Sequence, residues 1–171
     1  MEIHVKTVYD QRALTAMARG LRKTVRRKRN RRSRIVGGVL MVLALLLGVS
    51  ILRTGLCWQG VADLVVAVVL LAVLLTEDQV NGYFAGRKAM PGARDTETVF
   101  TEQDYVTTAQ TAQTRWSYEG VCGIAEGKDY IVLALSNRHA QVYDKRGISG
   151  GTAEELLTLL QDKTGLPVTK M

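Results

Sequence analysis

Two long apolar runs in the middle of the chain constrain its fold more than any other feature. The first, residues 35–52, has eighteen residues and no charge, and the second, residues 56–75, is twenty residues rich in Val, Leu and Ala. As a helix the first run is about 27 Å long, close to the hydrocarbon thickness of a bilayer. A short polar break around Arg53 separates the two runs. The pattern predicts a transmembrane hairpin over residues 35–75.

Charge is distributed unevenly around this hairpin. Residues 1–34 hold twelve Lys and Arg against two acidic residues, whereas residues 35–171 carry a small acidic excess. A basic cluster stands directly before the first run and comprises Arg26, Arg27, Lys28, Arg29, Arg31, Arg32 and Arg34. Positive residues beside a span stay in the cytoplasm and attract anionic lipid, at about 1 kcal/mol per residue. We therefore expect a two-pass cell-membrane protein with both termini cytoplasmic and the anionic inner leaflet as a partner.

The basic excess also bears on nucleic acid. It lies beside the membrane and not on a folded module, where a nucleic-acid-binding domain would carry it. A nucleic-acid partner is therefore not expected.

Asp63 is the one ionisable residue within the two apolar runs. A charge inside a membrane is costly, so such a residue is by default a candidate for function. Arg53 is expected to face Asp63 across the short turn, and a local ion pair is the simpler interpretation. The alternative is a role for Asp63 in a small structural or regulatory subunit of a membrane transport or envelope complex.

Residues 1–9 have the alternation of a short strand, with Ile3, Val5 and Thr7 on one face. A lone strand is not stable in water, so we expect it to join a sheet elsewhere in the chain. The C-terminal domain is the available partner.

Residues 10–34 are expected to form a basic amphipathic juxtamembrane helix that Asp10 caps and that runs on into the first apolar run. After the hairpin, residues 76–95 are expected to be a helical extension followed by a linker, with Pro91 and Gly92 ending the helix.

The pattern changes to a period of two in the C-terminal domain, residues 96–171. Six short strands are expected over residues 96–103, 104–110, 112–117, 121–126, 129–135 and 139–143. A helix follows, with a capping box from Thr152 to Glu155, a face of leucines, and a stop at Gly165. The predicted fold class is α+β, a membrane hairpin joined to a small antiparallel domain.

Several motifs of this domain occur together in a known order. They are Phe100–Val106, Arg115–Glu126, Tyr130–Leu135 and the final helix after Lys145-Arg146-Gly147-Ile148. Over essentially its whole length the chain resembles the YcxB-like family of bacterial membrane proteins. The resemblance implies a pleckstrin-homology-like (PH-like) half-open barrel, capped by the C-terminal helix and extended by the N-terminal strand. One position departs from the pattern, because Asp144 stands where a proline is expected.

Motifs for catalysis are absent from the sequence. It has no P-loop, GxGxxG, GxSxG or HExxH motif and no metal-binding Cys/His spacing, and the family carries no agreed catalytic residues. We expect no enzyme activity, cofactor or metal. Cys57 and Cys122 would lie on opposite sides of the bilayer, which excludes a disulfide between them.

One polar stretch is a possible anion or lipid site, composed of Lys145, Arg146, Gly150 and Gly151. Two cations precede a Gly-rich segment that opens a helix N-terminus, where backbone N–H groups bind phosphate or carboxylate. The alternative is that the glycines allow a turn and Thr152 caps the helix.

The function expected from these features is a membrane-anchored, non-enzymatic adaptor or sensor. Its cytoplasmic domain would bind a protein, a peptide or an anionic lipid head group at the inner leaflet. An unknown protein partner or a homo-oligomer is compatible with the sequence.

Overall fold

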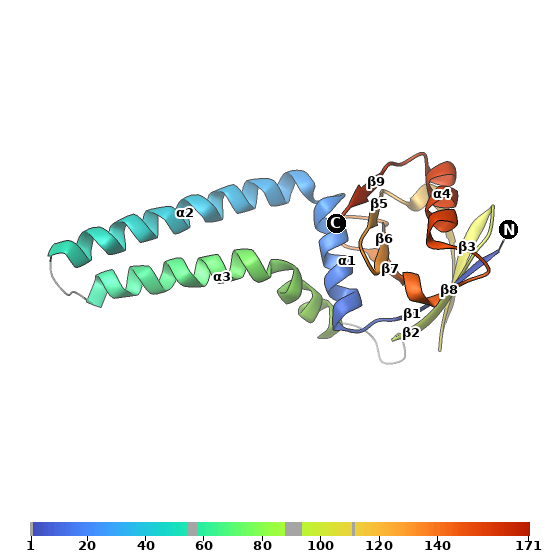
Figure 1. The fold of residues 1–171 in the computed structure, drawn as a ribbon, viewed down its shortest axis with the longest axis horizontal. Coiled ribbons are helices and arrows are strands. Elements are labelled where there is room, and N and C mark those ends of the chain that lie inside the picture. The colour runs from blue at the N-terminus through green and yellow to red at the C-terminus, as the bar shows by residue number, and fades with distance from the viewer. Residues whose placement is uncertain (1, 55–57, 88–93, 111) are drawn as a thin grey trace. The chain divides into compact units, whose positions relative to one another are not determined.

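The computed structural model describes residues 2–54, 58–87, 94–110 and 112–171. The chain divides into two compact units (Figure 1). The sheet unit consists of Met1–Arg27 and Asp78–Met171, and the hairpin unit consists of Lys28–Glu77. The fold class is α+β, as predicted.

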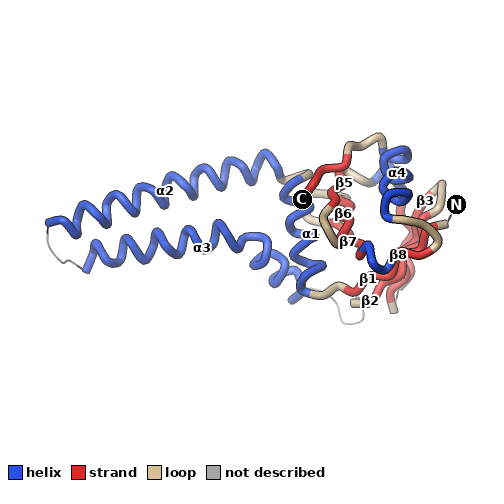
Figure 2. Tube along the Cα trace, viewed as in Figure 1, coloured by secondary structure: helices blue, strands red, loops and turns tan. Residues whose placement is uncertain are grey.

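The sheet unit contains two sheets (Figure 2). The first has the strand order β4-β3-β2-β1-β8 and the second the order β7-β6-β5-β9. The strands are β1 (Ile3–Val8), β2 (Asp95–Phe100), β3 (Asp104–Ala109), β4 (Gln113–Ser117), β5 (Gly123–Glu126), β6 (Tyr130–Ala134), β7 (Ala140–Asp144), β8 (Ile148–Ser149) and β9 (Val168–Lys170). The predicted strands are present with bounds shifted by a few residues. The parallel pairing of β9 with β5 was not predicted.

The N-terminal strand joins the first sheet, which confirms the prediction. β1 pairs antiparallel with β2 from Ile3 opposite Phe100 to Val8 opposite Asp95, and its other edge pairs with β8. Ile3, Val5 and Thr7 are buried, as the alternation requires. β1 is thus an interior strand of the sheet, although the whole hairpin separates it from β2 in the sequence.

Helix α4 (Ala153–Thr164) buries its leucine face in the main core. Leu156, Leu157 and Leu160 pack with side chains of both sheets. The predicted capping box is formed, and Gly165 ends the helix in the left-handed region at φ 66°. Burial of each leucine contributes about 2 kcal/mol to the stability of the fold.

Helix α1 (Gln11–Lys23) covers the second sheet with small and apolar side chains. Ala13 belongs to a second core cluster with Ala125, Val132 and Val142. The approach is close at Gly20, where an added Cβ would lie 2.7 Å from the side chain of Val132. The sheet unit therefore requires glycine at this position.

The prediction of one helix over residues 10–34 is wrong. α1 ends at Lys23, and a turn separates it from helix α2 (Arg27–Thr54). At Thr24 the backbone leaves the helical region, and Thr24 Oγ1 donates back to the carbonyl of Gly20. Thr24 packs beside Gly123 of β5, where an added Cβ would lie 2.9 Å from Thr24 Cβ. The break is set by this packing on the sheet, which no local residue pattern reveals.

The hairpin unit consists of α2 and the first part of helix α3 (Trp58–Arg87). Both helices are long and apolar enough to cross a membrane, by length and composition. Most of their apolar side chains are exposed, including Leu46 (63%) and Val68 (64%). The helices approach closely where an added Cβ at Gly48 would lie 3.1 Å from the carbonyl oxygen of Gly60. They lie side by side as an antiparallel pair (Figure 1).

The predicted helical extension after residue 75 is formed, because α3 continues to Arg87. Pro91 and Gly92 of the predicted linker lie outside the described residues. The chain is described again from Arg94, and β2 begins at Asp95.

Candidate functional site: a basic cleft beside helix α1

Both cations of the predicted anion-binding stretch have carboxylate partners. Lys145 Nζ donates to Glu126 Oε1 at 2.7 Å, and Arg146 Nη2 donates to Asp144 Oδ2 at 2.8 Å. These bonds lower the pKa of the Glu126 carboxyl, which Lys170 also contacts, and the pKa of the Asp144 carboxyl. Asp144 also accepts from the backbone N–H of Arg146, so it stabilises the turn in place of the expected proline.

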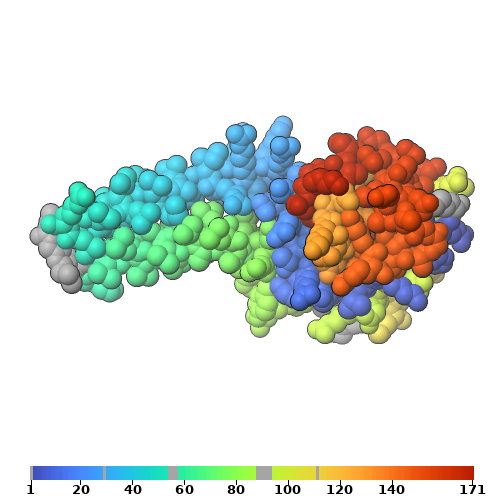
Figure 3. All heavy atoms as spheres, in the orientation of Figure 1, coloured from blue at the N-terminus to red at the C-terminus, as the bar shows by residue number. Residues whose placement is uncertain are grey.

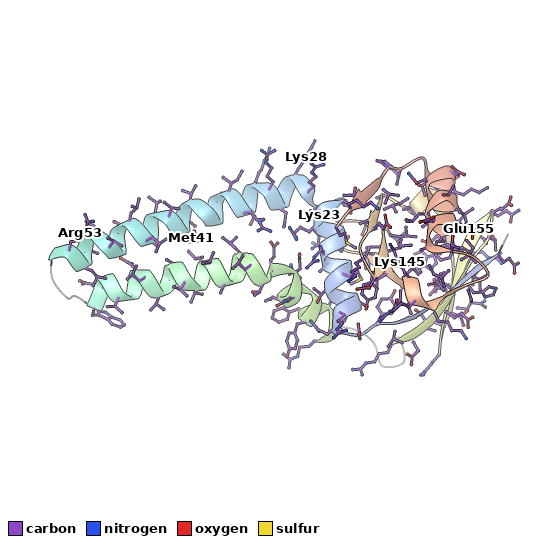
Figure 4. All side chains as sticks on the ribbon, in the orientation of Figure 1. Lys23, Lys28, Met41, Arg53, Lys145 and Glu155 are labelled. Carbon is purple, nitrogen blue, oxygen red and sulfur yellow. The ribbon has the colours of Figure 1, made fainter. Side chains whose placement is uncertain are left out.

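The glycines of the same stretch have a structural role. Gly150 has φ +78°, and an added Cβ would lie 2.8 Å from the carbonyl oxygen of Glu2. The backbone N–H of Thr152 donates to Glu155 Oε2 at 2.8 Å, within the capping box of α4. Figure 4 labels Lys145, in the turn after β7, and Glu155, in the first turn of α4. The geometry of Gly150, Gly151 and Thr152 thus matches the turn-and-cap alternative, and an anion site there stays a prediction.

The basic cluster divides into one attached and several exposed side chains. Arg26 Nε donates to the carbonyl of Asn137 at 2.6 Å, which attaches this arginine to the sheet unit. Five members are exposed, namely Arg27, Lys28, Arg31, Arg32 and Arg34. The side chain of Arg29 is not among those that the structure describes. The exposed members of the basic cluster can therefore contact an anionic surface.

Arg53 and Asp63 do not form the expected ion pair in the described part of the hairpin. The helix register explains this, because an added Cβ at Gly48 would lie 3.2 Å from the side chain of Leu64. Asp63 is therefore nearly level with Gly48, five residues before Arg53 along α2. Arg53 is exposed at the far end of α2 (Figure 4). Asp63 is partly buried and has no ion-pair partner among the residues that the structure describes, and its place inside a membrane stays a prediction.

A basic cleft of about 630 Å³ lies between α1 and the turn that joins β5 to β6. Its charged and aromatic lining residues are Arg12, Arg19, Lys128, Asp129, Tyr130 and Arg146. Figure 3 shows α1, in blue, directly against the orange segment that contains this turn. The seven-residue spacing of Arg12 and Arg19 places both on one face of α1. The spacing of these two arginines was visible in the sequence, but the long-range packing that brings them to Lys128 and Arg146 was not.

The charges in the cleft are not equally neutralised. Arg146 is held by Asp144, and Arg19 Nε lies 3.5 Å from Asp78 Oδ2. Arg12 and Lys128 are both exposed, and neither has an ion-pair or hydrogen-bond partner within the described ranges. The cleft therefore offers cations that are free to bind an anionic group.

Beside the cleft, α1 contacts the C-terminal end of α3 within the sheet unit. Arg22 binds Asp78 through two hydrogen bonds, and Gln11 Nε2 donates to the carbonyl of Gln79 at 3.3 Å. The two helices touch closely at Gly82, where an added Cβ would lie 2.8 Å from the backbone nitrogen of Thr15. We call these contacts the α1–α3 junction. It joins the end of the second long helix to the helix that covers the second sheet.

The described residues hold no group of side chains suited to a metal ion. Within residues 2–54, 58–87, 94–110 and 112–171, no three His, Cys, Asp or Glu side chains are grouped as ligands.

Comparison with known proteins adds no assignment. No protein-family model matches the sequence, and no curated protein matches it either. The resemblance to the YcxB-like family therefore stays a prediction from its motifs.

Proposed function

We propose that this chain is a membrane-anchored, non-enzymatic adaptor or sensor. In this proposal α2 and α3 span a cell membrane, both termini are cytoplasmic, and the sheet unit binds a protein, a peptide or an anionic lipid head group at the inner leaflet. The observation that carries the proposal is the insertion of the hairpin between β1 and β2, which are paired over six residues. A chain that leaves and re-enters the same sheet has both ends of its hairpin on one side of a membrane.

The surface of the hairpin supports the membrane part of the proposal. Exposed apolar side chains such as Leu46 and Val68 would be unfavourable in water over so long a stretch, and lipid removes that cost. Trp58, 79% exposed at the start of α3, is a residue type that favours the membrane interface. The exposed cations at the start of α2 would then face anionic head groups.

The strand order supports the PH-like part of the resemblance. β1 to β4 are consecutive neighbours in the first sheet, β5 to β7 are consecutive neighbours in the second, and α4 follows them in the chain. The α1–α3 junction provides a physical connection between a membrane helix and this domain, as a sensor requires.

A second candidate function rests on Asp63. Because Arg53 does not neutralise it, Asp63 fits a subunit that acts through its hairpin in a membrane complex. The two functions predict different effects of Asp63→Asn.

Alkaline carbonate extraction followed by cross-linked co-purification tests the proposal. We expect the full chain to stay with membranes in carbonate and to dissolve only in detergent, since a spanning hairpin is held by lipid. Release by carbonate would contradict the membrane anchor.

For the adaptor, the set of proteins recovered after cross-linking of the full chain should be the same for wild type and Asp63→Asn. Loss of those proteins with Asp63→Asn would instead favour the subunit that acts through its hairpin.

A further inference from the structure

The basic cleft beside α1 lies entirely within the sheet unit. We propose that this cleft binds a phosphate-bearing ligand, either a soluble phosphorylated molecule or the phosphate of a lipid head group. The inference deepens the proposed function, on which it rests, by naming the class of ligand that the sheet unit recognises.

Cations from separate segments of the chain line the cleft. Arg12 comes from the first turn of α1 and Lys128 from the β5–β6 turn, and both line the cleft. Neither has a carboxylate partner in the portion of the chain that the structure describes. Arg19 and Arg146 add two guanidinium groups, 51% and 70% exposed, whose donors are not all used by Asp78 and Asp144. A guanidinium can bind phosphate with two donors at once, and lysine supplies a further charge.

The size and the apolar part of the cleft suit a compact ligand. A volume of about 630 Å³ is in the range of small-molecule sites, and it exceeds what a single carboxylate needs. Tyr130 and Met171 supply an apolar surface beside the charges. Asp129 on the same lining lowers the net positive charge of the cleft, which stays positive because four cations line it. A compact group with more than one negative charge, which phosphate carries at neutral pH, fits this arrangement best.

Arg19 connects the cleft to the α1–α3 junction, because it lines the cleft and contacts Asp78. Arg22 holds Asp78 with two bonds of 2.7 and 2.6 Å, whereas Arg19 makes a longer contact of 3.5 Å with the same carboxylate. A phosphate in the cleft would attract Arg19 and weaken only this lesser contact. By linkage, removal of the Asp78 charge should then strengthen phosphate binding.

The test uses the full chain in phosphatidylcholine nanodiscs and isothermal titration with inorganic pyrophosphate. We expect binding that Arg12→Ala and Lys128→Ala each weaken about tenfold, because each removes one charge-assisted contact. Arg138→Ala and Lys163→Ala remove matched exposed cations outside the cleft and should leave binding unchanged. Equal melting temperatures of the variants show that folding is intact.

A second arm distinguishes the source of the phosphate. Vesicles of phosphatidylcholine with phosphatidic acid are added to the same nanodisc samples. Vesicle binding that needs Arg12 and Lys128 and that pyrophosphate displaces indicates a lipid head group, and pyrophosphate binding alone indicates a soluble ligand. The proposal is overturned if neither probe binds, or if binding is independent of Arg12 and Lys128. Both of these outcomes are independent of the carbonate extraction result. The membrane anchor and the phosphate-binding cleft are therefore tested separately.

Discussion

Arg22 and Asp78 form a two-point ion pair across 56 residues of sequence, with Nε 2.7 Å from Oδ1 and Nη2 2.6 Å from Oδ2. Both side chains are largely buried, at 22% and 12% exposed. The pair fixes the end of α3 on α1, and α1 in turn packs on the second sheet. Within the sheet unit, the C-terminal end of α3 is therefore bonded directly to the helix that covers the second sheet.

Asp78→Ala should loosen this junction. Loss of the two hydrogen bonds between Arg22 and Asp78 should cost about 2 kcal/mol locally. We expect faster amide hydrogen exchange over residues 78–87 in detergent-solubilised protein. Asp162→Ala, an exposed position on α4, is the matched control and should leave exchange unchanged. Identical exchange in Asp78→Ala and wild type would show that the ion pair does not hold the junction.

Gly82 should tolerate no side chain. An added Cβ would lie 2.8 Å from the backbone nitrogen of Thr15 and 3.0 Å from its Cα, and a backbone cannot rotate away as a side chain can. Gly82→Ala should therefore lower the melting temperature of the full chain, despite the better helix propensity of alanine. Gly38→Ala is the control, because its Cβ would meet nothing within 4 Å. Equal melting temperatures for the two variants would contradict close packing at Gly82.

Glu126 should make stability depend on pH in the acid range. Hydrogen bonds from Lys145 and Lys170 lower the pKa of its carboxyl below the ordinary value of 4.5. A pKa that is lower in the folded state stabilises the fold above the unfolded pKa, and this stabilisation is lost as pH falls through the folded pKa.

Glu126→Gln should therefore reduce the loss of melting temperature on acidification. Some loss should remain, because the pKa of Asp144 is also lowered by Arg146. Glu154→Gln, on the exposed surface of α4, provides the control. A melting temperature that falls as steeply in Glu126→Gln as in wild type would count against the Lys145–Glu126–Lys170 cluster.

Local patterns were sufficient for some elements and not for others. The alternation of Ile3, Val5 and Thr7 predicted the face of β1, and the spacing of Thr152 and Glu155 predicted the start of α4. These features depend on a few neighbouring residues. The break after Lys23 was not predicted because it depends on contact with Gly123, a hundred residues away.

The candidate site shows the same division. Lys145 and Arg146 were recognised as adjacent cations, but their partners were not. Lys145 reaches Glu126 because β5, β6 and β7 pair in one sheet, and Arg146 binds Asp144 in the turn after β7. The pairing of Arg53 with Asp63 was expected from their closeness in sequence. The register of α2 and α3, set by close approach at Gly48, separates them along the helix axis. The sequence shows where the cations stand along the chain, but it does not show which of them have carboxylate partners in the fold.

The central claim is that the hairpin spans a membrane and returns the chain to the same side. The native cysteines test it directly, since Cys57 follows α2 in the sequence and Cys122 is exposed on the sheet unit. Intact cells or spheroplasts that express Cys57→Ser or Cys122→Ser are treated with a membrane-impermeant maleimide. The proposal predicts labelling of the protein that retains Cys57, and labelling of the protein that retains Cys122 only after lysis. Labelling of Cys122 in intact cells would contradict it.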